Sequence, residues 1–201
     1  GGTPFEFSSF AQCPIAVGKH GIRYDTATRD LIAAEIEAST QIHMFDGLVL
    51  IASCDKNVPA VLLAAARLDI PSIVVPGGPM LAGRYRGRDV VTTDLDVECW
   101  AWGVGKPRLP LEELDALEDA VCPGPGSCAL LGTANTMQCL AEAGGLALPF
   151  AGTIPAPSAR RLWLAKESGR RIVELVERGI KPSQILTRGA LENMIRVLHA
   201  I

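Results

Sequence analysis

Apolar and polar positions alternate along the first part of the chain with two different periods. Residues 26–40 carry apolar side chains at helical spacing, which predicts a helix with Leu31, Ala34 and Ile36 near one face. Residues 46–52 form a short and nearly continuous apolar run, which is typical of a parallel strand covered on both faces. The chain therefore predicts a helix followed by a buried strand.

The same alternation continues to the end of the chain. The pattern over 58–68 predicts a helix that packs back across a sheet, and the pattern over 71–76 predicts the next parallel strand. Ser158 follows a proline-rich connector and is a suitable N-cap for a long helix over about 159–178. Residues 188–201 predict a last helix. Together these segments predict a strand-helix-strand unit with further helices around it.

Composition supports a folded domain and argues against several classes of function. Of the 201 residues, 48% are hydrophobic, and the mean hydropathy is +0.24, so a buried core is available. We expect residues 1–201 to form a single α/β domain in which helices flank a parallel sheet in three layers. A net charge of -3 and 5% aromatic residues do not suit nucleic acid binding. No apolar run reaches the roughly 18 residues of a membrane span, so we expect a cytoplasmic protein.

Cysteines are the residues with the clearest chemical interest, and they occur at positions 13, 54, 99, 122, 128 and 139. A core this apolar does not need a disulfide framework, and thiols in a reducing cytoplasm serve as ligands, nucleophiles or packing residues. We expect Cys99 and Cys139 to be packing residues. Cys122 stays ambiguous because it shares a glycine-rich loop with Cys128. Cys54 and Cys128 are the two candidates for chemistry.

Cys54, Asp55 and Lys56 place a thiol, a carboxylate and an amine directly after the apolar run 48–52. Residues that follow a parallel strand commonly line the ligand-binding edge of an α/β sheet. A carboxylate there suits a hard cation such as Mg²⁺, which prefers oxygen ligands. The amine of Lys56 would repel this cation, so the lysine either binds an anionic substrate, stays apart, or is modified into an oxygen ligand. The alternative without a metal is an ion pair between Asp55 and Lys56.

Cys128 follows a loop of glycine and proline over 123–126. Ser127 is predicted to be an N-cap, which places Cys128 in the first turn of a helix that ends at Gly144-Gly145. The partial positive charge of a helix N-terminus favours the thiolate form of such a cysteine. Cys54 and Cys128 together would suit a soft metal or an iron-sulfur cluster with further ligands. Two buried structural cysteines are the alternative.

Four motifs in this order resemble the dihydroxy-acid dehydratase family, which also includes dehydratases for sugar acids such as 6-phosphogluconate, xylonate and arabinonate. The motifs are CDKxxP at 54–59, GPGSC at 124–128, GTANTM at 132–137 and LP...IPAPS at 148–158. The resemblance extends over the whole chain. Because family members are much longer, this chain is expected to be the central part of their N-terminal α/β domain.

The resemblance implies a [2Fe-2S] cluster and a Mg²⁺ ion. Cys54 and Cys128 match two of the three cysteines that hold the cluster in the family, and the third is expected upstream of Gly1. Asp55 and Lys56 match the Mg²⁺ ligands, with Lys56 acting through a carbamate on its amine. The family's catalytic serine base belongs to a C-terminal domain, so no catalytic residue is expected on this chain. The 201-residue piece by itself is therefore expected to be inactive.

The reaction implied by the resemblance removes water from a 2,3-dihydroxy acid or an aldonate and yields a 2-keto acid. In the family, Mg²⁺ binds the carboxylate and the 2-hydroxyl, and the cluster acts as a Lewis acid on the departing 3-hydroxyl. The substrate is then a small molecule, and the full-length protein is expected to be a homo-oligomer, either a dimer or a tetramer. Arg84, Arg86 and Arg88 either contact a carboxylate or phosphate or belong to a solvated loop.

One position departs from the family pattern. Just before Ile15, where many members carry an Asp-Gly pair that supplies a further Mg²⁺ ligand, this chain has Cys13-Pro14. Thiolate is a poor ligand for Mg²⁺, so the carboxylate comes from elsewhere, the metal site differs, or activity is lost. The alternative function is a non-catalytic, degenerate α/β metal-binding domain of the same family. A third is a zinc-bound or disulfide-bearing structural domain.

Overall fold

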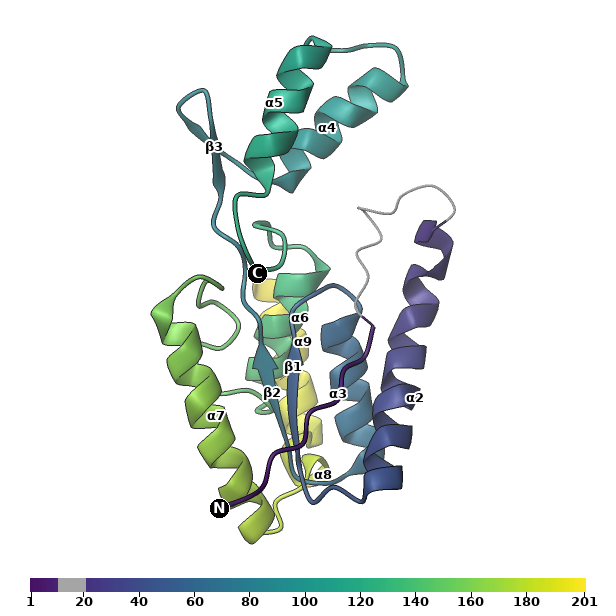
Figure 1. Cartoon of the computed structure of the whole chain (residues 1–201), viewed down its shortest axis with the longest axis vertical. Helices are drawn as coiled ribbons and strands as arrows, with labels where there is room; N and C mark the ends of the chain where they lie inside the picture. The colour runs from purple at the N-terminus through teal and green to yellow at the C-terminus, as the bar shows by residue number, and fades with distance from the viewer. Residues whose placement is uncertain (11–20) are drawn as a thin grey trace.

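The computed structural model describes residues 1–10 and 21–201 (Figure 1). Its helices are the 3-10 helix η1 (Gly21–Tyr24) and the α-helices α2 (Asp25–His43), α3 (Asn57–Leu68), α4 (Thr92–Gly103), α5 (Leu111–Val121), α6 (Thr133–Ala143), α7 (Ala159–Glu177), α8 (Pro182–Ile185) and α9 (Arg188–Ala200). Its strands are β1 (Leu48–Ala52), β2 (Ser72–Pro76), β3 (Gly83–Tyr85) and β4 (Arg88–Val90). None of the helices among the described residues combines the length and the apolar character needed to cross a membrane.

β1 and β2 form a parallel sheet at the centre of the molecule. They pair along their whole length, with Leu48 opposite Ser72, and α3 is the crossover between them. A further parallel bridge joins Val74 to Ala147, and the Val74 amide donates to the carbonyl of Leu146 at 2.7 Å. The segment after α6 therefore lies along the other edge of β2. The predicted strand-helix-strand unit is confirmed.

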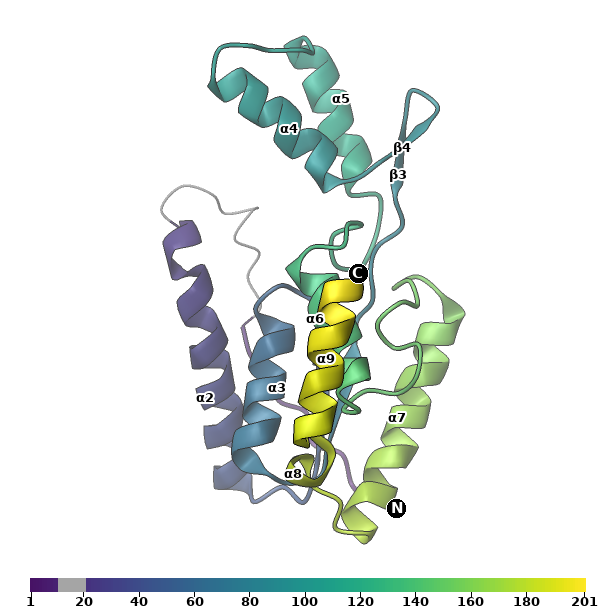
Figure 2. The same cartoon turned by 180° about the vertical axis from the view of Figure 1, so that it is seen from behind.

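Helices cover this sheet and build the main core. α3 packs against both strands and against α2, and α7 also packs against both strands. Figure 1 shows α7 on one side of the strands and α2 and α3 on the other, and Figure 2 shows α9 beside α6 from behind. β2 is buried at every position, since α3 and α7 pack against it and it lies between β1 and the segment after α6. The predicted α/β architecture is confirmed.

The burial of β1 differs from the prediction. Leu48, Leu50 and Ala52 are buried, whereas Val49 and Ile51 are 41% and 73% exposed. This alternation is typical of a strand with one covered face. The continuous apolar run did not predict it, because a run of apolar residues does not show which neighbours cover each face.

The buried face of α2 also differs from the prediction. Leu31 is 58% exposed and Ala34 is exposed, whereas Ile32, Ala33 and Ile36 are buried. α2 packs against α3 rather than directly on the sheet, so the orientation of α3 decides which stripe of α2 is covered. The prediction of a helix is confirmed, but the prediction that Leu31, Ala34 and Ile36 lie near one face is wrong, because Ile36 is buried and the other two are exposed.

β3, β4, α4 and α5 form a unit that projects from the end of the sheet (Figure 1). Val90, Leu117 and Val121 form a small hydrophobic cluster within it, separate from the main core. The hairpin of β3 and β4 packs against α5, and α4 packs against α5. That residues 1–201 form one domain stays a prediction.

Candidate functional site

The first candidate loop, residues 53–56, connects β1 directly to α3. The amide of Gly77, which follows β2, donates to the carbonyl of Ala52 at 2.9 Å, so the ends of the two strands are held side by side. The amide of Val58 donates to the carbonyl of Cys54 at 3.2 Å as α3 begins. The loop therefore lies at the carboxyl end of a parallel strand, where the sequence predicted it.

Lys56 lies between two carboxylates, only one of which the sequence indicated. Its Nζ is 3.0 Å from Oδ2 of Asp25 and 3.1 Å from Oδ2 of Asp55. Partial burial lowers the pKa of Lys56, but hydrogen bonds to both carboxylates and their negative charges outweigh it, so the pKa is raised above its ordinary 10.5. The unmodified side chain of Lys56 thus forms ion pairs with both Asp25 and Asp55. Asp25 comes from the first turn of α2. In the sequence, it stands out only as an acidic residue at the start of a predicted helix, which does not indicate a contact with Lys56.

Asp55 has one carboxylate oxygen with a partner and one without. Its Oδ2 accepts a hydrogen bond from Lys56, whereas Oδ1 is buried and has no hydrogen-bond partner among the residues that the structure describes. Buried polar atoms in proteins are nearly always satisfied, because an unsatisfied one costs free energy. A hard cation would satisfy this oxygen, so Asp55 fits the metal role that the resemblance implies.

The second candidate loop, residues 122–132, connects α5 to α6 and places Cys128 differently from the prediction. α6 begins at Thr133, so Cys128 lies outside its first turn. Ser127 does not cap this helix, because its amide donates to the carbonyl of Gly78 at 3.0 Å and its backbone pairs with the segment after β2. The prediction of a thiolate stabilised by a helix N-terminus at Cys128 is therefore wrong.

A buried glutamine on α6 joins the two loops. The side chain of Gln138 is fully buried, and its Nε2 donates to the carbonyl of Ser53 and to the hydroxyl of Ser127, both at 3.0 Å. Its Oε1 accepts a hydrogen bond from the amide of Gly78 at 2.8 Å. One amide group therefore contacts both candidate loops and the segment that follows β2.

Asn135 completes this network one helical turn earlier. Its Nδ2 donates to the carbonyl of Cys128 at 2.8 Å and to the carbonyl of Leu130, and its Oδ1 accepts from the hydroxyl of Ser127 at 2.6 Å. Sequence reasoning missed Asn135 and Gln138. The available signal was their three-residue spacing, which places two amides on one face of a helix that is otherwise rich in small and apolar residues.

The cysteines differ in exposure. Cys54 and Cys128 are half-buried, and Cys122 is exposed. Cys139 is partly buried, and this burial raises the pKa of its thiol, which agrees with a packing role. Cys99 is exposed, so its prediction as a packing residue is wrong. α4 buries few of its residues, which leaves most of its surface to solvent.

The described residues do not bring together a set of side chains that could hold a metal ion by itself. Within residues 1–10 and 21–201, no three side chains of His, Cys, Asp or Glu gather in a way that could hold a metal ion. The dipeptide Cys13-Pro14 lies outside the described residues. The structure thus places Asp55 and Lys56 in contact, and it carries Cys54 and Cys128 on two loops that both accept a hydrogen bond from Gln138.

Arg84, Arg86 and Arg88 lie in the β3–β4 hairpin, and their side chains are more than half exposed. Each approaches a carboxylate of the chain, and the pairs are Arg84–Asp89 at 2.6 Å, Arg86–Glu113 at 2.6 Å and Arg88–Asp94 at 3.8 Å. This arrangement agrees with a solvated, ion-paired loop. A contact with substrate stays a prediction.

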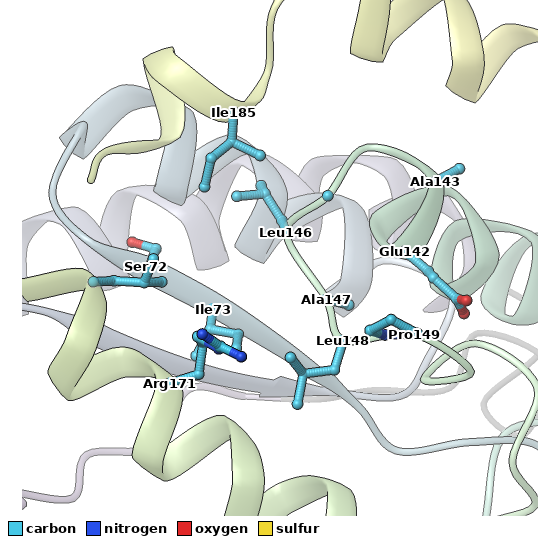
Figure 3. Close-up of a pocket in the computed structure, with 12 residues that line it drawn as sticks. Ser72, Ile73, Glu142, Ala143, Leu146, Ala147, Leu148, Pro149, Arg171 and Ile185 are labelled. Carbon is cyan, nitrogen blue, oxygen red and sulfur yellow. The ribbon is translucent and has the colours of Figure 1, made fainter. Parts of the chain in front are cut away.

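A pocket of about 530 Å³ lies elsewhere, beside β2 and α7 (Figure 3). Its walls include Ile73 at the start of β2, Leu146 and Leu148 from the segment after α6, and Arg171 from α7. The lining is mainly apolar, and none of the predicted site residues takes part in it. Both candidate loops follow the strand ends instead, so this pocket is not the candidate site.

Comparison with known proteins gives matches over the whole chain. Residues 1–201 match the family described as dihydroxy-acid/6-phosphogluconate dehydratase N-terminal. Curated relatives called dihydroxy-acid dehydratase are 53% identical in Halothermothrix orenii, 52% in Caldicellulosiruptor saccharolyticus and 50% in Pyrococcus abyssi, each over 100% of this chain. The chain spans 36% of the length of these relatives.

Proposed function

The chain belongs to the dihydroxy-acid/6-phosphogluconate dehydratase family, and we propose that the full-length protein is a hydro-lyase that converts a 2,3-dihydroxy acid to a 2-keto acid. The relatives are called dihydroxy-acid dehydratase, which favours a dihydroxy acid over an aldonate as substrate. The observation that carries the proposal is the loop of Cys54, Asp55 and Lys56 at the carboxyl end of β1, joined by Gln138 to the loop of Cys128.

We assign Cys54 and Cys128 as two ligands of a [2Fe-2S] cluster, and Asp55 and Lys56 as ligands of Mg²⁺. Thiolates suit iron-sulfur clusters, and the unsatisfied Oδ1 of Asp55 suits a hard cation. When bound, these groups supply Lewis acidity towards the hydroxyl and carboxylate oxygens of the substrate. Further ligands come from outside the described residues in this proposal.

Lys56 opposes a cation as long as its amine carries a positive charge. We propose that a carbamate forms on Nζ: carbon dioxide adds to the neutral amine, a nitrogen-carbon bond forms, and one proton is released. The product carries negative oxygen in place of the ammonium, so it attracts a cation rather than repelling it. Asp25 and Asp55 hold the ammonium form through ion pairs of 3.0 and 3.1 Å, and both pairs are lost on modification.

We assign the base that removes the C2 proton to a residue outside this chain, because the relatives are far longer than the 201 residues. The chain's own contribution is to bind and orient. The two loops hold their cysteines half-buried beyond the carboxyl ends of the strands. We therefore expect residues 1–201 alone to fail to catalyse the reaction.

The test is made on anaerobically purified full-length protein. Iron and sulfide analysis with visible absorption spectra reports the cluster, and 2-keto acid formation is measured with branched-chain dihydroxy acids, pentonates and hexonates. Cys54→Ser and Cys128→Ser are expected to lose iron and activity, and Cys122→Ser, in the same loop as Cys128, is the matched control that keeps both. A colourless, iron-free preparation after careful reconstitution would contradict the proposal. A cluster without turnover on any substrate would favour the non-catalytic alternative.

The remaining proposals concern the setting of the full-length protein. We propose that it acts in the cytoplasm on a small-molecule substrate as a dimer or tetramer. Size-exclusion chromatography with light scattering measures the oligomeric state directly. A monomer at assay concentration would contradict that part alone.

A further inference from the structure

The side chain of Gln138 has a place in the structure that the proposed chemistry does not use. It is 0% exposed, and both its amide nitrogen and its amide oxygen take part in hydrogen bonds. Two of the bonds go to Ser53 and Ser127, each at 3.0 Å. These serines directly precede Cys54 and Cys128. The glutamine therefore touches the backbone or side chain next to each proposed cluster ligand.

The third contact of Gln138 joins this pair to a part of the backbone with little room to move. Gly78 donates its amide to Oε1 at 2.8 Å and has a φ of +85°. A Cβ atom at this position would lie 2.3 Å from Nη2 of Arg161 and 2.4 Å from the carbonyl oxygen of Ile154, so the packing around it is close. Gln138 thus ties both loops to a segment whose own position is closely constrained.

We propose that Gln138 is a positioning residue that sets the relative placement of the loops of Cys54 and Cys128. It acts through the carbonyl of Ser53 and the hydroxyl of Ser127, and it touches no substrate. The inference rests on the proposed function only for the identity of the bound group, the [2Fe-2S] cluster. The hydrogen bonds that carry it belong to this chain and are independent of that group.

Replacing the Gln138 amide by an apolar group of similar length removes its hydrogen bonds and keeps its packing, so the two effects can be measured separately. Gln138→Met keeps most of the buried volume, but it leaves the Gly78 amide and the Ser53 carbonyl without a buried partner. Water or a shifted loop would then have to satisfy these groups. The matched control is Ser168→Ala on α7, which removes a buried hydrogen bond of 2.9 Å to the carbonyl of Leu164, away from both loops.

The first measurement is hydrogen exchange of the full-length protein without its cluster. The amides of Gly78, Met80 and Ser127 are hydrogen-bonded within or beside this network. In Gln138→Met we expect these amides to exchange about tenfold faster or more, with α7 unchanged. In Ser168→Ala we expect wild-type exchange of these three amides, because the Ser168 hydroxyl donates to the Leu164 carbonyl within α7.

The second measurement uses the same variants after reconstitution with iron and sulfide. We expect Gln138→Met to shift the electron paramagnetic resonance g values of the reduced cluster and to speed iron loss to a chelator several-fold. Ser127→Ala, which removes only one partner of Gln138, should change both in the same direction and by less. Ser168→Ala should keep the wild-type spectrum even where it lowers the melting temperature.

The outcomes test two claims separately: that Gln138 positions the two loops, and that the loops hold an iron-sulfur cluster. Wild-type exchange of the Gly78, Met80 and Ser127 amides in Gln138→Met, or a spectral change no larger than that of Ser168→Ala, would overturn the proposal. If Gln138→Met does not fold, Ser127→Ala against Ser168→Ala decides it by the same readouts. If the wild-type protein takes up no iron, the cluster assignment fails, and the exchange experiment alone decides whether Gln138 places the loops.

Discussion

The two cysteine loops lie beyond the carboxyl ends of the strands but are held in different ways. The loop of Cys54 is a short connection from β1 to α3, and backbone hydrogen bonds fix both of its ends. The loop of Cys128 runs from α5 to α6, and side chains of Asn135 and Gln138 hold it from the helix that follows. The first loop is thus held by regular elements and one buried side chain, Gln138, whereas the second is held by the backbone pairing of Ser127 and by two buried side chains, Asn135 and Gln138.

The largest expected effect tests the backbone of the second loop. Gly126 has a φ of +129°, and a Cβ there would lie 2.3 Å from the amide nitrogen of Met80. Gly126→Ala is expected to lose about 3 to 5 kcal/mol of unfolding free energy in the full-length protein, through strain and overpacking. Gly124→Ala is the matched control, because no atom lies within 4 Å of its added Cβ. Chemical denaturation measures both, and equal stability of the two variants would contradict the close approach.

The next effect tests whether side chains contribute more to holding the second loop than the first. Asn135→Ala removes the buried donor to the carbonyls of Cys128 and Leu130, and should cost about 1 to 3 kcal/mol. Asn57→Ala, beside the first loop, removes only an exposed contact of 3.4 Å and should stay within about 0.5 kcal/mol of wild type. Urea denaturation of the full-length variants measures the difference. Similar losses would mean that the loops are held in the same way.

A smaller effect is expected from the ion pair of the first loop. Asp25→Asn removes one of two carboxylates around Lys56, whose side chain is 21% exposed, and should cost about 1 kcal/mol when no metal is present. Glu192→Gln on α9 weakens an ion pair with Arg188, whose side chain is 94% exposed, and should cost less than about 0.5 kcal/mol. Thermal melts of both full-length variants compare them. An unchanged melting temperature in Asp25→Asn would show that the pair adds no stability.

The smallest expected effect is a pH dependence at the first loop. The pKa of Lys56 is raised in the folded protein, so the native state holds this proton more tightly than the unfolded chain does. Its contribution is complete below the ordinary value of 10.5 and is lost as the pH rises through the raised value. The stability difference between wild type and Lys56→Met should therefore shrink above about pH 10.5. Denaturation at several alkaline pH values measures it, and a constant difference would contradict a raised pKa.

Local sequence patterns predicted the elements of the fold better than their orientation. The spacing of apolar residues located α2, β1, α3 and β2, because helical and strand periods are properties of neighbouring residues. The exposure of Leu31 and Ile51 was not predicted, because it depends on which helix covers each face. The start of α6 was also placed too early, since Ser127 pairs with the segment after β2 instead of capping the helix.

By itself, the sequence determined that a thiol, a carboxylate and an amine follow a parallel strand, and its motifs identified the family. Only the tertiary structure decided that Asp25 shares Lys56 with Asp55, and that Gln138 links the two cysteine loops. Both contacts join residues far apart in the chain, and no local period or spacing encodes them. A buried polar group needs a partner at a fixed distance, and only the packed fold supplies that partner.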